Sequence, residues 1–199
     1  MIEQLQGKNI VVYDCEIKRE IDMKNITWND HDKMGLSVAV LFDYMDMDYK
    51  VYFEKDLQKL CHRLNESELV VAFNQKGFDE KLLRALGGDL KEAIPNYDML
   101  EESRKATGWC EGKRFPSGLK LDNHLEAIFG KDQMKTEHGS QAPVMWQKGL
   151  HAEVITYCLA DVKRERMLFE HIWEKGWVET AVHGVKEIST AAIKQVVEG

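Results

Sequence analysis

The sequence predicts an α/β domain in which helices flank a mixed β-sheet. Three strand-like segments follow one another early in the chain, and helical and strand-like segments alternate after them. Strands with no room for a helix between them form an antiparallel meander, whereas alternating strands and helices form parallel pairs. The length of 199 residues, of which 44% are hydrophobic, suits one domain with a sizeable core. We place that domain at residues 1–176 and treat residues 177–199 as a C-terminal extension that can pack on it.

The antiparallel part of the sheet is predicted from three apolar segments. Residues 9–17 form a β-branched run, which is typical of a central strand buried on both faces. Residues 36–42 and 49–53 are two further strand-like runs, joined by the turn-like segment 43–48. We therefore expect these three strands to pair with one another.

The rest of the chain alternates between helical and strand-like segments. Apolar residues at helical spacing, and glycines that follow the last of them, mark the helices. The expected order is a helix (55–64), a strand (69–73), a helix (78–86), a short strand (95–100), and helices at 101–105, 122–129 and 151–175. Residues 177–199 fit either a strand followed by a helix or a partly ordered tail.

The composition argues against several classes of protein. Lys and Arg number 27 against 34 Asp and Glu, so the formal net charge is −7. Such a chain does not hold nucleic acid by bulk positive charge alone, although it can still be an enzyme that acts on nucleic acid. No segment approaches the roughly 20 apolar residues of a membrane span, so we expect no membrane partner.

The cysteines and the first residues indicate the compartment. The four cysteines lie far apart and form no C-x-x-C pair, which argues against a zinc ribbon or a thioredoxin-like site. Cys15 and Cys158 stand in apolar segments, where buried free thiols are expected. The first four residues show no basic region followed by an apolar one, so we expect no signal peptide and a cytoplasmic location.

Two carboxylates stand out in the first strand. Asp14 and Glu16 are two residues apart, so their side chains point to the same face of the sheet. Acids inside an apolar strand are costly to bury unless they are paired or hold a metal ion. The alternative is that both lie at a solvent-facing end of the strand.

Two later segments carry further acids. Asn74 ends a buried strand, and Asp79 opens the next helix, where it can also be a first-turn acid favoured by the helix dipole. Tyr157 and Asp161 are four residues apart on the long helix and share a face. Here the alternative is a core tyrosine beside a surface charge.

Together, these acids suggest a metal site. Hard divalent cations such as Mg²⁺ prefer carboxylate oxygens, and two such ions about 3.5–4 Å apart can activate a water and stabilise the leaving oxygen of a phosphodiester. That chemistry needs several carboxylates that converge from different elements, and a group that holds the attacking water. The strand and the two helix segments supply such a set.

The same residues resemble the three exonuclease motifs of the DEDD superfamily, the DnaQ-like 3′–5′ exonucleases with a ribonuclease H-like fold. The motifs, in chain order, are Asp14-x-Glu16, Asn74-x-x-x-Phe78-Asp79 and Tyr157-x-x-x-Asp161. One branch of the superfamily has Tyr four positions before the last Asp, and the other has His five positions before it. With Tyr157 and Thr156 at these positions, the chain resembles the tyrosine branch.

Closer similarity is to a bacterial and phage group of predicted ribonuclease H-like nucleases. The segments 118–122 and 139–149 resemble that group, in which an Asp after the middle strand, here Asp98, also recurs. The chain departs from its relatives at Ile17, where a Thr is common. This departure removes no metal ligand.

The resemblance implies a two-metal site with a positioned water. It implies that two Mg²⁺ or Mn²⁺ ions are held by Asp14, Glu16, Asp79 and Asp161. It also implies that Tyr157 positions the nucleophilic water through a hydrogen bond, because a phenol ordinarily stays protonated at neutral pH. Asn74 is a candidate for placing the substrate strand or bracing its loop.

A basic segment rich in aromatic residues is the candidate surface for a nucleic-acid strand. Between residues 103 and 120, five basic residues oppose one acid, whereas eight acids oppose four lysines between residues 22 and 56. Phosphate contacts combined with base stacking suit a single strand, although the segment can also be an ordinary solvated loop. The candidate substrate-binding residues here are Arg104, Lys105, Trp109, Lys113, Arg114 and Phe115. Lys135 and His138, in a later polar loop, are further candidates for phosphate contact.

Three functions compete at this stage. The favoured one is a metal-dependent 3′–5′ exonuclease that acts on single-stranded ends, with DNA favoured over RNA. The second is a nucleic-acid-binding or scaffolding domain that kept the fold without the chemistry, and the presence of all four carboxylates and Tyr157 argues against it. The third is an endonuclease or flap-cutting enzyme with the same two-metal site.

Overall fold

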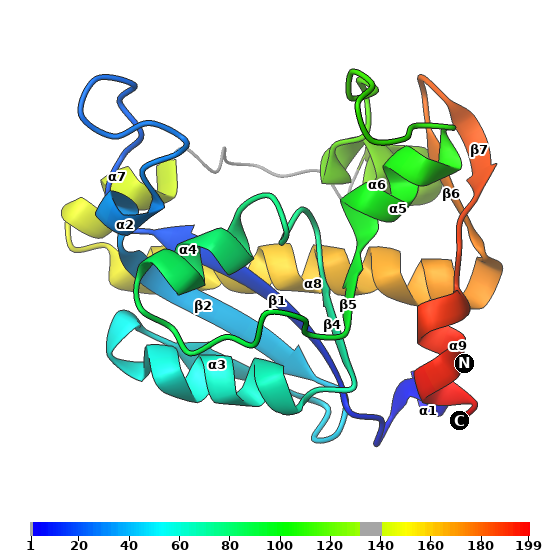
Figure 1. Ribbon diagram of the computed structural model, residues 1–199, viewed down its shortest axis with the longest axis horizontal. Coiled ribbons are helices and arrows are strands. Elements are labelled where there is room, and N and C mark those ends of the chain that lie inside the picture. Colours follow the sequence, from blue (N-terminus) through cyan, green and yellow to red (C-terminus); the bar gives the residue numbers. More distant parts are fainter. Residues whose placement is uncertain (1, 132–140) are drawn as a thin grey trace.

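Five strands form the central sheet of the computed structural model, which describes residues 2–131 and 141–199 (Figure 1). Their order across the sheet is β3-β2-β1-β4-β5. The strands are β1 (Ile10–Ile17), β2 (Leu36–Asp43), β3 (Asp48–Tyr52), β4 (Leu69–Ala72) and β5 (Asn96–Asp98). The expected mixed sheet is confirmed, because β1, β2 and β3 pair antiparallel whereas β4 and β5 add to β1 in parallel.

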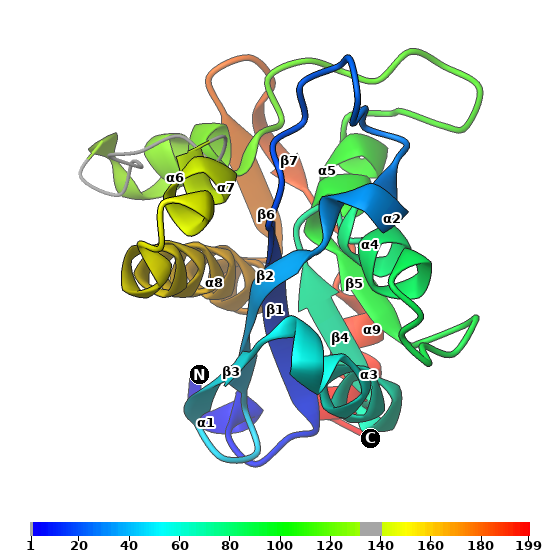
Figure 2. The same ribbon diagram turned by 90° about the vertical axis from the view of Figure 1, so that its left-hand side faces the viewer.

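Helices cover both faces of this sheet. The long helix α8 lies on one face, and α3 and α4 lie on the other (Figure 2). Around them the chain forms α1 (Ile2–Leu5), α2 (His31–Met34), η1 (Glu54–Asp56), α3 (Leu57–Glu66), α4 (Asp79–Ala85), α5 (Met99–Ala106), α6 (Leu121–Phe129), α7 (Ala142–Gln147) and α8 (His151–Lys175). Among the described helices, none combines the length and the apolar character needed to cross a lipid bilayer.

The alternation of β1 divides the core in two. Ile10 and Val12 pack in the cluster that contains α8, whereas Val11 and Tyr13 pack in the cluster that contains α3 and α4. Both sets are fully buried, as expected for a central strand with apolar residues on both faces. The even-numbered positions of β1 therefore face α8 along its whole length, and this alternation continues into the candidate site.

The segment after α8 forms a two-stranded hairpin and a short helix. The hairpin consists of β6 (Trp177–Thr180) and β7 (Gly184–Glu187), and α9 spans Ala191–Val197. Val178, Ile188 and Ile193 are buried in the same cluster as α8. The sequence left two possibilities for this segment, a strand followed by a helix or a partly ordered tail. The structure has the strand and the helix, with a second strand between them.

The boundary between β5 and α5 differs from the expected one. The strand ends at Asp98 and the helix begins at Met99, two residues earlier than the sequence pattern indicates. The Asp98 carboxylate accepts hydrogen bonds from the backbone N–H groups of Leu100 and Glu101, at 3.1 and 3.2 Å. This N-cap satisfies two of the helix's initial donors and so begins the helix early.

Candidate active site

Asp14 and Glu16 occupy the α8 face of β1, near its carboxyl end. Both side chains are partly buried. Together with Asp161 they form a group of three carboxylates, and one oxygen from each lies within 4.8 Å of the other two. The pairing of β1 with β2 shifts register between Glu16 and Ile17. Such irregularities re-aim side chains at the ends of strands, and this one lies directly beside the carboxylate group.

Helix α8 brings the third carboxylate to this group. Asp161 and Tyr157 are 6% and 9% exposed and lie one turn apart on the face of α8 that packs on the sheet. Between them, the Cys158 thiol donates to the Asp14 carbonyl oxygen at 3.4 Å. A close contact between α8 and β1 at this point thus sets the positions of Tyr157 and Asp161 relative to Asp14.

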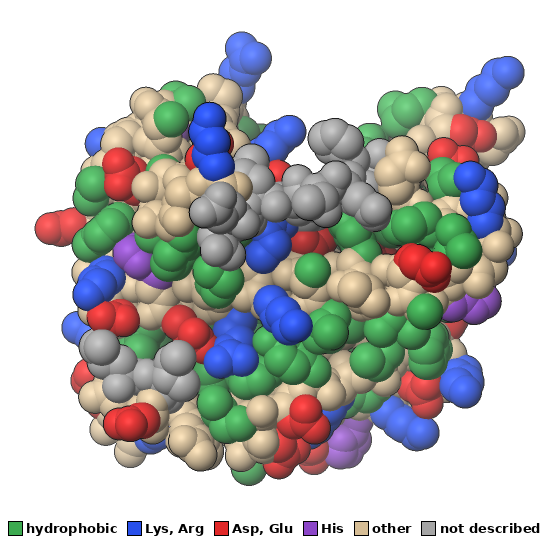
Figure 3. Space-filling model, turned by 180° about the vertical axis from the view of Figure 1, so that it is seen from behind, with side chains coloured by type: hydrophobic (Ala, Val, Ile, Leu, Met, Phe, Trp, Pro, Cys, Tyr) green, Lys and Arg blue, Asp and Glu red, His purple; other side chains and the backbone are tan. Residues whose placement is uncertain are grey.

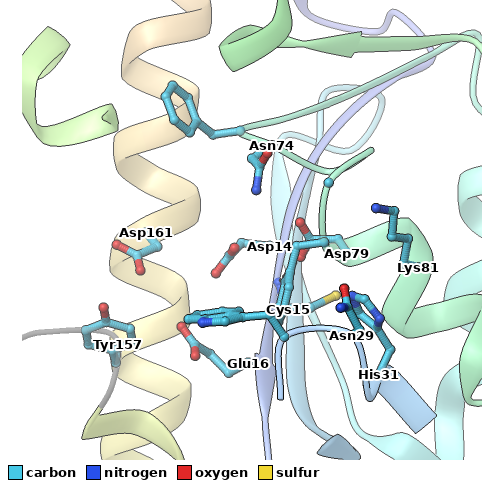
Figure 4. A pocket seen from close by; sticks show the side chains of 14 residues that line it. Asp14, Cys15, Glu16, Asn29, His31, Asn74, Asp79, Lys81, Tyr157 and Asp161 are labelled. Atoms are coloured by element: carbon cyan, nitrogen blue, oxygen red, sulfur yellow. Dashed lines mark hydrogen bonds between the residues drawn. The ribbon is translucent and has the colours of Figure 1, made fainter. Parts of the chain in front are cut away.

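Asp79 approaches from the other side of Asp14. It begins α4, is 3% exposed, and its Oδ1 accepts a hydrogen bond from the backbone N–H of Cys15 at 3.2 Å. Figure 4 shows Asp14 between Asp161 on α8 and Asp79 on the α4 side. Asp79 lines the same cavity but is not a member of the group of three carboxylates within 4.8 Å.

The loop that leads into Asp79 is held by Asp98. Asp98 Oδ1 accepts from the backbone N–H of Asn74 at 2.9 Å, and its Oδ2 accepts from that of Lys76 at 3.1 Å. Asn74 adopts a left-handed backbone with φ 74°, a conformation that Asn tolerates better than most residues. A Cβ on Gly77 would lie 2.4 Å from Asn74 Oδ1, so a side chain at position 77 would displace that of Asn74.

These residues surround an open cavity of about 420 Å³ (Figure 4). Polar and ionisable side chains line both of its walls. Tyr157 and Asp161 lie on the α8 wall, and Asn74, Asp79 and Lys81 lie on the opposite wall. Trp28, Asn29 and His31, from the connection between β1 and β2, also line it. The structure thus brings all five predicted catalytic residues and Asn74 to one cavity.

Burial and mutual repulsion raise the proton affinity of two carboxylates. The pKa of Asp14 lies well above its usual range because the group is desolvated and because Glu165, Glu16 and Asp79 repel its charge. Desolvation raises the pKa of Asp79 to about 7, although hydrogen bonds from its own and the Cys15 backbone act in the opposite sense. Such crowding of acids is relieved by a bound cation, so the electrostatics suit a divalent metal ion.

Sequence reasoning missed three charged residues beside this group. Glu165 is 4% exposed on α8, and repulsion from its charge helps to raise the pKa of Asp14. Arg164, 7% exposed, donates to Asp161 Oδ1 at 3.1 Å and also bonds Asp122 of α6. The available signal was spacing, because positions 161 and 165 are one turn apart; the contact with α6 has no counterpart in the local sequence.

The predicted nucleic-acid segment lies outside the cavity. The rings of Trp109 and Phe115 are 5.1 Å apart, and the Arg104 guanidinium lies 4.1 Å from the Phe115 ring centroid. Lys105 pairs with Glu101 and Glu102, each at 2.7 Å. Of the predicted substrate-binding residues within 2–131 and 141–199, Asn74 alone lines the cavity, while Lys113 and Arg114 are exposed in the loop after α5.

Surface charge is mixed where the molecule is seen from behind. On the coloured part of that face, basic, acidic and apolar side chains alternate without a broad basic field (Figure 3). Residues 18–35 and 107–120 project from the same end of the sheet (Figures 1 and 2). Lys135 and His138 lie outside the described residues.

Comparison with known proteins shows the fold. No family model matches the chain, and no curated protein matches it in sequence. Among solved structures, a family B DNA polymerase of the archaeon Pyrobaculum calidifontis is similar over 82% of this chain, with 14% identity and a TM-score of 0.59. RNase D of Trypanosoma brucei is similar over 84%, with 16% identity and a TM-score of 0.50.

These similarities confirm the ribonuclease H-like α/β fold. The chain spans 24% of the polymerase and 58% of the RNase D chain.

Proposed function

We propose that this chain is a divalent-metal-dependent 3′–5′ exonuclease that hydrolyses phosphodiester bonds at single-stranded ends, with DNA as the favoured substrate. The observation that carries the proposal is the convergence of Asp14, Glu16 and Asp161, from a strand and a helix, with ligand atoms within 4.8 Å of one another. Tyr157 lines the same cavity. The similarity in fold to a DNA polymerase and to RNase D supports a nucleic-acid substrate.

The donor set fits Mg²⁺ or Mn²⁺. All three grouped ligands are carboxylates, which such hard cations prefer over nitrogen or sulfur donors. Asp79 lines the opposite wall of the cavity, beside Asp14, and completes the set of four carboxylates for two ions. Burial, together with repulsion from the neighbouring acids, raises the pKa of Asp14, and a bound cation would relieve both effects.

The reaction assigned to this cavity is an in-line hydrolysis. A water oxygen bonds to the phosphorus of the terminal nucleotide, the bond from phosphorus to the 3′ oxygen of the preceding nucleotide breaks, and that oxygen takes up a proton. When bound, two divalent ions supply acidification of the water and stabilisation of the leaving oxygen. The product is a nucleoside 5′-monophosphate.

The remaining roles belong to groups of the protein. The Tyr157 hydroxyl orients the water by a hydrogen bond, from the α8 wall of the cavity. Asn74, held in place by Asp98, contacts the substrate strand from the opposite wall. The aromatic and basic residues of the 104–115 segment bind the strand farther from the reacting bond, through stacking and phosphate contacts.

Digestion of end-labelled oligonucleotides tests this function. Single-stranded DNA and RNA carrying a 5′ label are incubated with the protein and Mg²⁺, Mn²⁺ or a chelator. We expect a ladder that shortens from the 3′ end in the presence of either metal, no reaction with chelator, and faster loss of DNA. Asp14→Asn and Asp161→Ala should abolish the ladder while leaving the circular dichroism spectrum unchanged.

Other outcomes would identify the competing functions. Strand binding without cleavage in any metal would point to a binding or scaffolding domain. Cleavage of a circular single strand would point to an endonuclease. Wild-type rates in both carboxylate variants would show that the site is misassigned.

A further inference from the structure

Arg164 is a buried cation that bridges the carboxylate group and helix α6. Its Nη1 donates to Asp161 Oδ1 at 3.1 Å, and its Nη2 bonds Asp122 Oδ1. The side chains of Arg164 and Asp161 are each 9% exposed, whereas that of Asp122 is 34% exposed. Arg164 thus stands between an acid of the cavity and an acid near the surface.

Helices α8 and α6 together bring these three side chains into contact. Arg164 follows Asp161 by three residues on α8, so both lie on neighbouring faces of the same helix. Asp122 lies in the first turn of α6, which packs against α8. Removing a guanidinium from water is costly, and such a cation is retained where its fork of donors is used.

We propose that Arg164 is a positioning residue for Asp161, and that Asp122 holds Arg164 in place for this purpose. The inference rests on the proposed function, because it assigns to Asp161 the role of a metal ligand. A hydrogen bond to one oxygen of a carboxylate fixes the plane of the whole group, and with it the direction of the other oxygen. Groups of this kind around a metal site typically contribute 10–100-fold to metal affinity.

The positive charge of Arg164 has a second consequence. Asp161 stands with Asp14 and Glu16, and Glu165 adds a further carboxylate beside Asp14. A guanidinium remains charged at all physiological pH values. Arg164 therefore keeps a fixed cation beside the acids, which favours a converged arrangement before any metal ion arrives.

Arg166 provides a matched control on the same helix. Its Nε bonds Glu170 Oε1 at 2.6 Å, and its guanidinium lies 3.9 Å from the Phe42 ring centroid. Like Arg164 it is an arginine of α8 paired with a carboxylate, but its partner Glu170, unlike Asp161, is not among the residues that line the cavity. Arg166→Lys thus replaces a guanidinium of α8 by an ammonium without changing any contact of Asp14, Glu16 or Asp161 that the structure shows.

Mn²⁺ binding by isothermal titration calorimetry tests the proposal, with Arg164→Lys, Asp122→Asn, Asp161→Asn and Arg166→Lys. We expect Arg164→Lys to weaken Mn²⁺ binding about 10-fold, Asp122→Asn to weaken it less, and Arg166→Lys to leave it unchanged. In an Asp161→Asn background, Arg164→Lys should cause no further loss, because the residue acts through Asp161. Thermal denaturation without metal should give similar midpoints for the two lysine variants.

Three results would overturn the proposal. Wild-type affinity in both Arg164→Lys and Asp122→Asn, with loss in Asp161→Asn, would refute the positioning role while leaving the proposed function intact. Equal losses in Arg164→Lys and Arg166→Lys would indicate a general effect on α8. Absence of Mn²⁺ binding in the wild-type protein would instead refute the proposed function, and the positioning role with it.

Discussion

Asp161 and Asp43 are both buried carboxylates, yet their surroundings assign them opposite purposes. Asp43, 1% exposed at the end of β2, accepts two hydrogen bonds from Arg63 at 2.8 Å and one from Lys50 at 2.8 Å. Asp161 stands among other acids, with Arg164 as a paired cation. Cations surround the first carboxylate and stabilise the fold, whereas the second stands with Asp14 and Glu16 in the group that we propose holds a metal ion.

Substitution should separate these purposes. Asp43→Asn leaves the partly buried cations Arg63 and Lys50 without this charged partner, so we expect the free energy of unfolding to fall by about 3 kcal/mol with the rate per folded molecule unchanged. Asp161→Asn should reduce the rate by roughly 10³-fold or more at nearly unchanged stability. Urea denaturation and nuclease assays on the same preparations check both. Similar losses of stability in the two variants would contradict the distinction.

The proton affinity of Asp79 makes a prediction about pH. Its pKa is raised from 3.8 to about 7, so between these values the folded state binds a proton that the unfolded state has released. The free energy of unfolding of the metal-free protein should therefore fall as pH rises through this window, by at most about 1.4 kcal/mol per pH unit for this group. Asp79→Asn should flatten the curve.

Chemical denaturation at about pH 4.5, 6 and 7.5, in the presence of chelator, measures this effect. A variant curve parallel to that of the wild-type protein would show that Asp79 titrates normally. Asp43 should behave in the opposite sense, because its pKa is lowered to about 2. Its contribution is fully present above the ordinary pKa of 3.8 and is lost as pH falls from that value through about 2.

At the scale of elements, the hairpin β6–β7 supports the loop that follows α5. His183 Nε2 lies 2.8 Å from the Ser117 carbonyl oxygen, and Val182 packs against Gly118. The same loop carries Trp109 and Phe115 in ring contact. The segment after α8 is therefore joined to the candidate strand-binding surface as well as to the core.

Gly118 tests this support. It has φ +77°, and an added Cβ would lie 2.7 Å from Val182 Cγ2. Gly112 is the control, because its φ is similar, at +85°, but an added Cβ there would have no atom within 4 Å. Both alanine variants strain the backbone, by about 1–3 kcal/mol, but only Gly118→Ala also displaces the hairpin. We expect Gly118→Ala to be the more destabilising in thermal denaturation, and equal effects would show that the hairpin contact is unimportant.

The loop itself should contribute to strand binding through charge. Lys113 and Arg114 are exposed, so Lys113→Ala and Arg114→Ala should each weaken binding of a single-stranded oligonucleotide. Each phosphate contact that is lost should reduce the slope of log K against log salt by about 0.7. Fluorescence anisotropy across salt concentrations measures the slope. Lys59→Ala is the control, because the Lys59 side chain is 79% exposed on α3, away from this loop. If Lys59→Ala changed the slope as much as the loop variants do, the assignment of the loop to strand binding would be contradicted.

Elements that are marked by their own local sequence could be predicted, whereas features that depend on contacts between distant residues could not. The β-branched run of β1 and the glycine that ends α8 at position 176 are local signals, and both elements occur where expected. The start of α5 depends on the Asp98 carboxylate, which also holds the loop before α4. The cap is a local signal, because Asp is a preferred N-cap residue, whereas the hold on the loop requires the pairing of β4 with β5 and has no local pattern.

For the molecule as a whole, the distribution of charge is more informative than its sum. The net charge of −7 argues against bulk electrostatic binding of nucleic acid, yet four of the acids line one cavity. The resemblance to three exonuclease motifs identified these four: Asp14 and Glu16 share one strand, Asp79 opens a helix, and Asp161 follows Tyr157 by one turn of a later helix. Arg164 and Asp122 escaped detection because they are 42 residues apart and meet only when α6 packs on α8.

Anomalous diffraction from crystals grown with Mn²⁺ tests the central claim most directly, since it locates the ions without reference to activity. We predict two anomalous peaks in the cavity, in contact with Asp14, Glu16, Asp79 and Asp161, and the loss of at least one peak in crystals of Asp161→Asn. An empty cavity at a Mn²⁺ concentration that supports hydrolysis of single-stranded DNA would contradict the account.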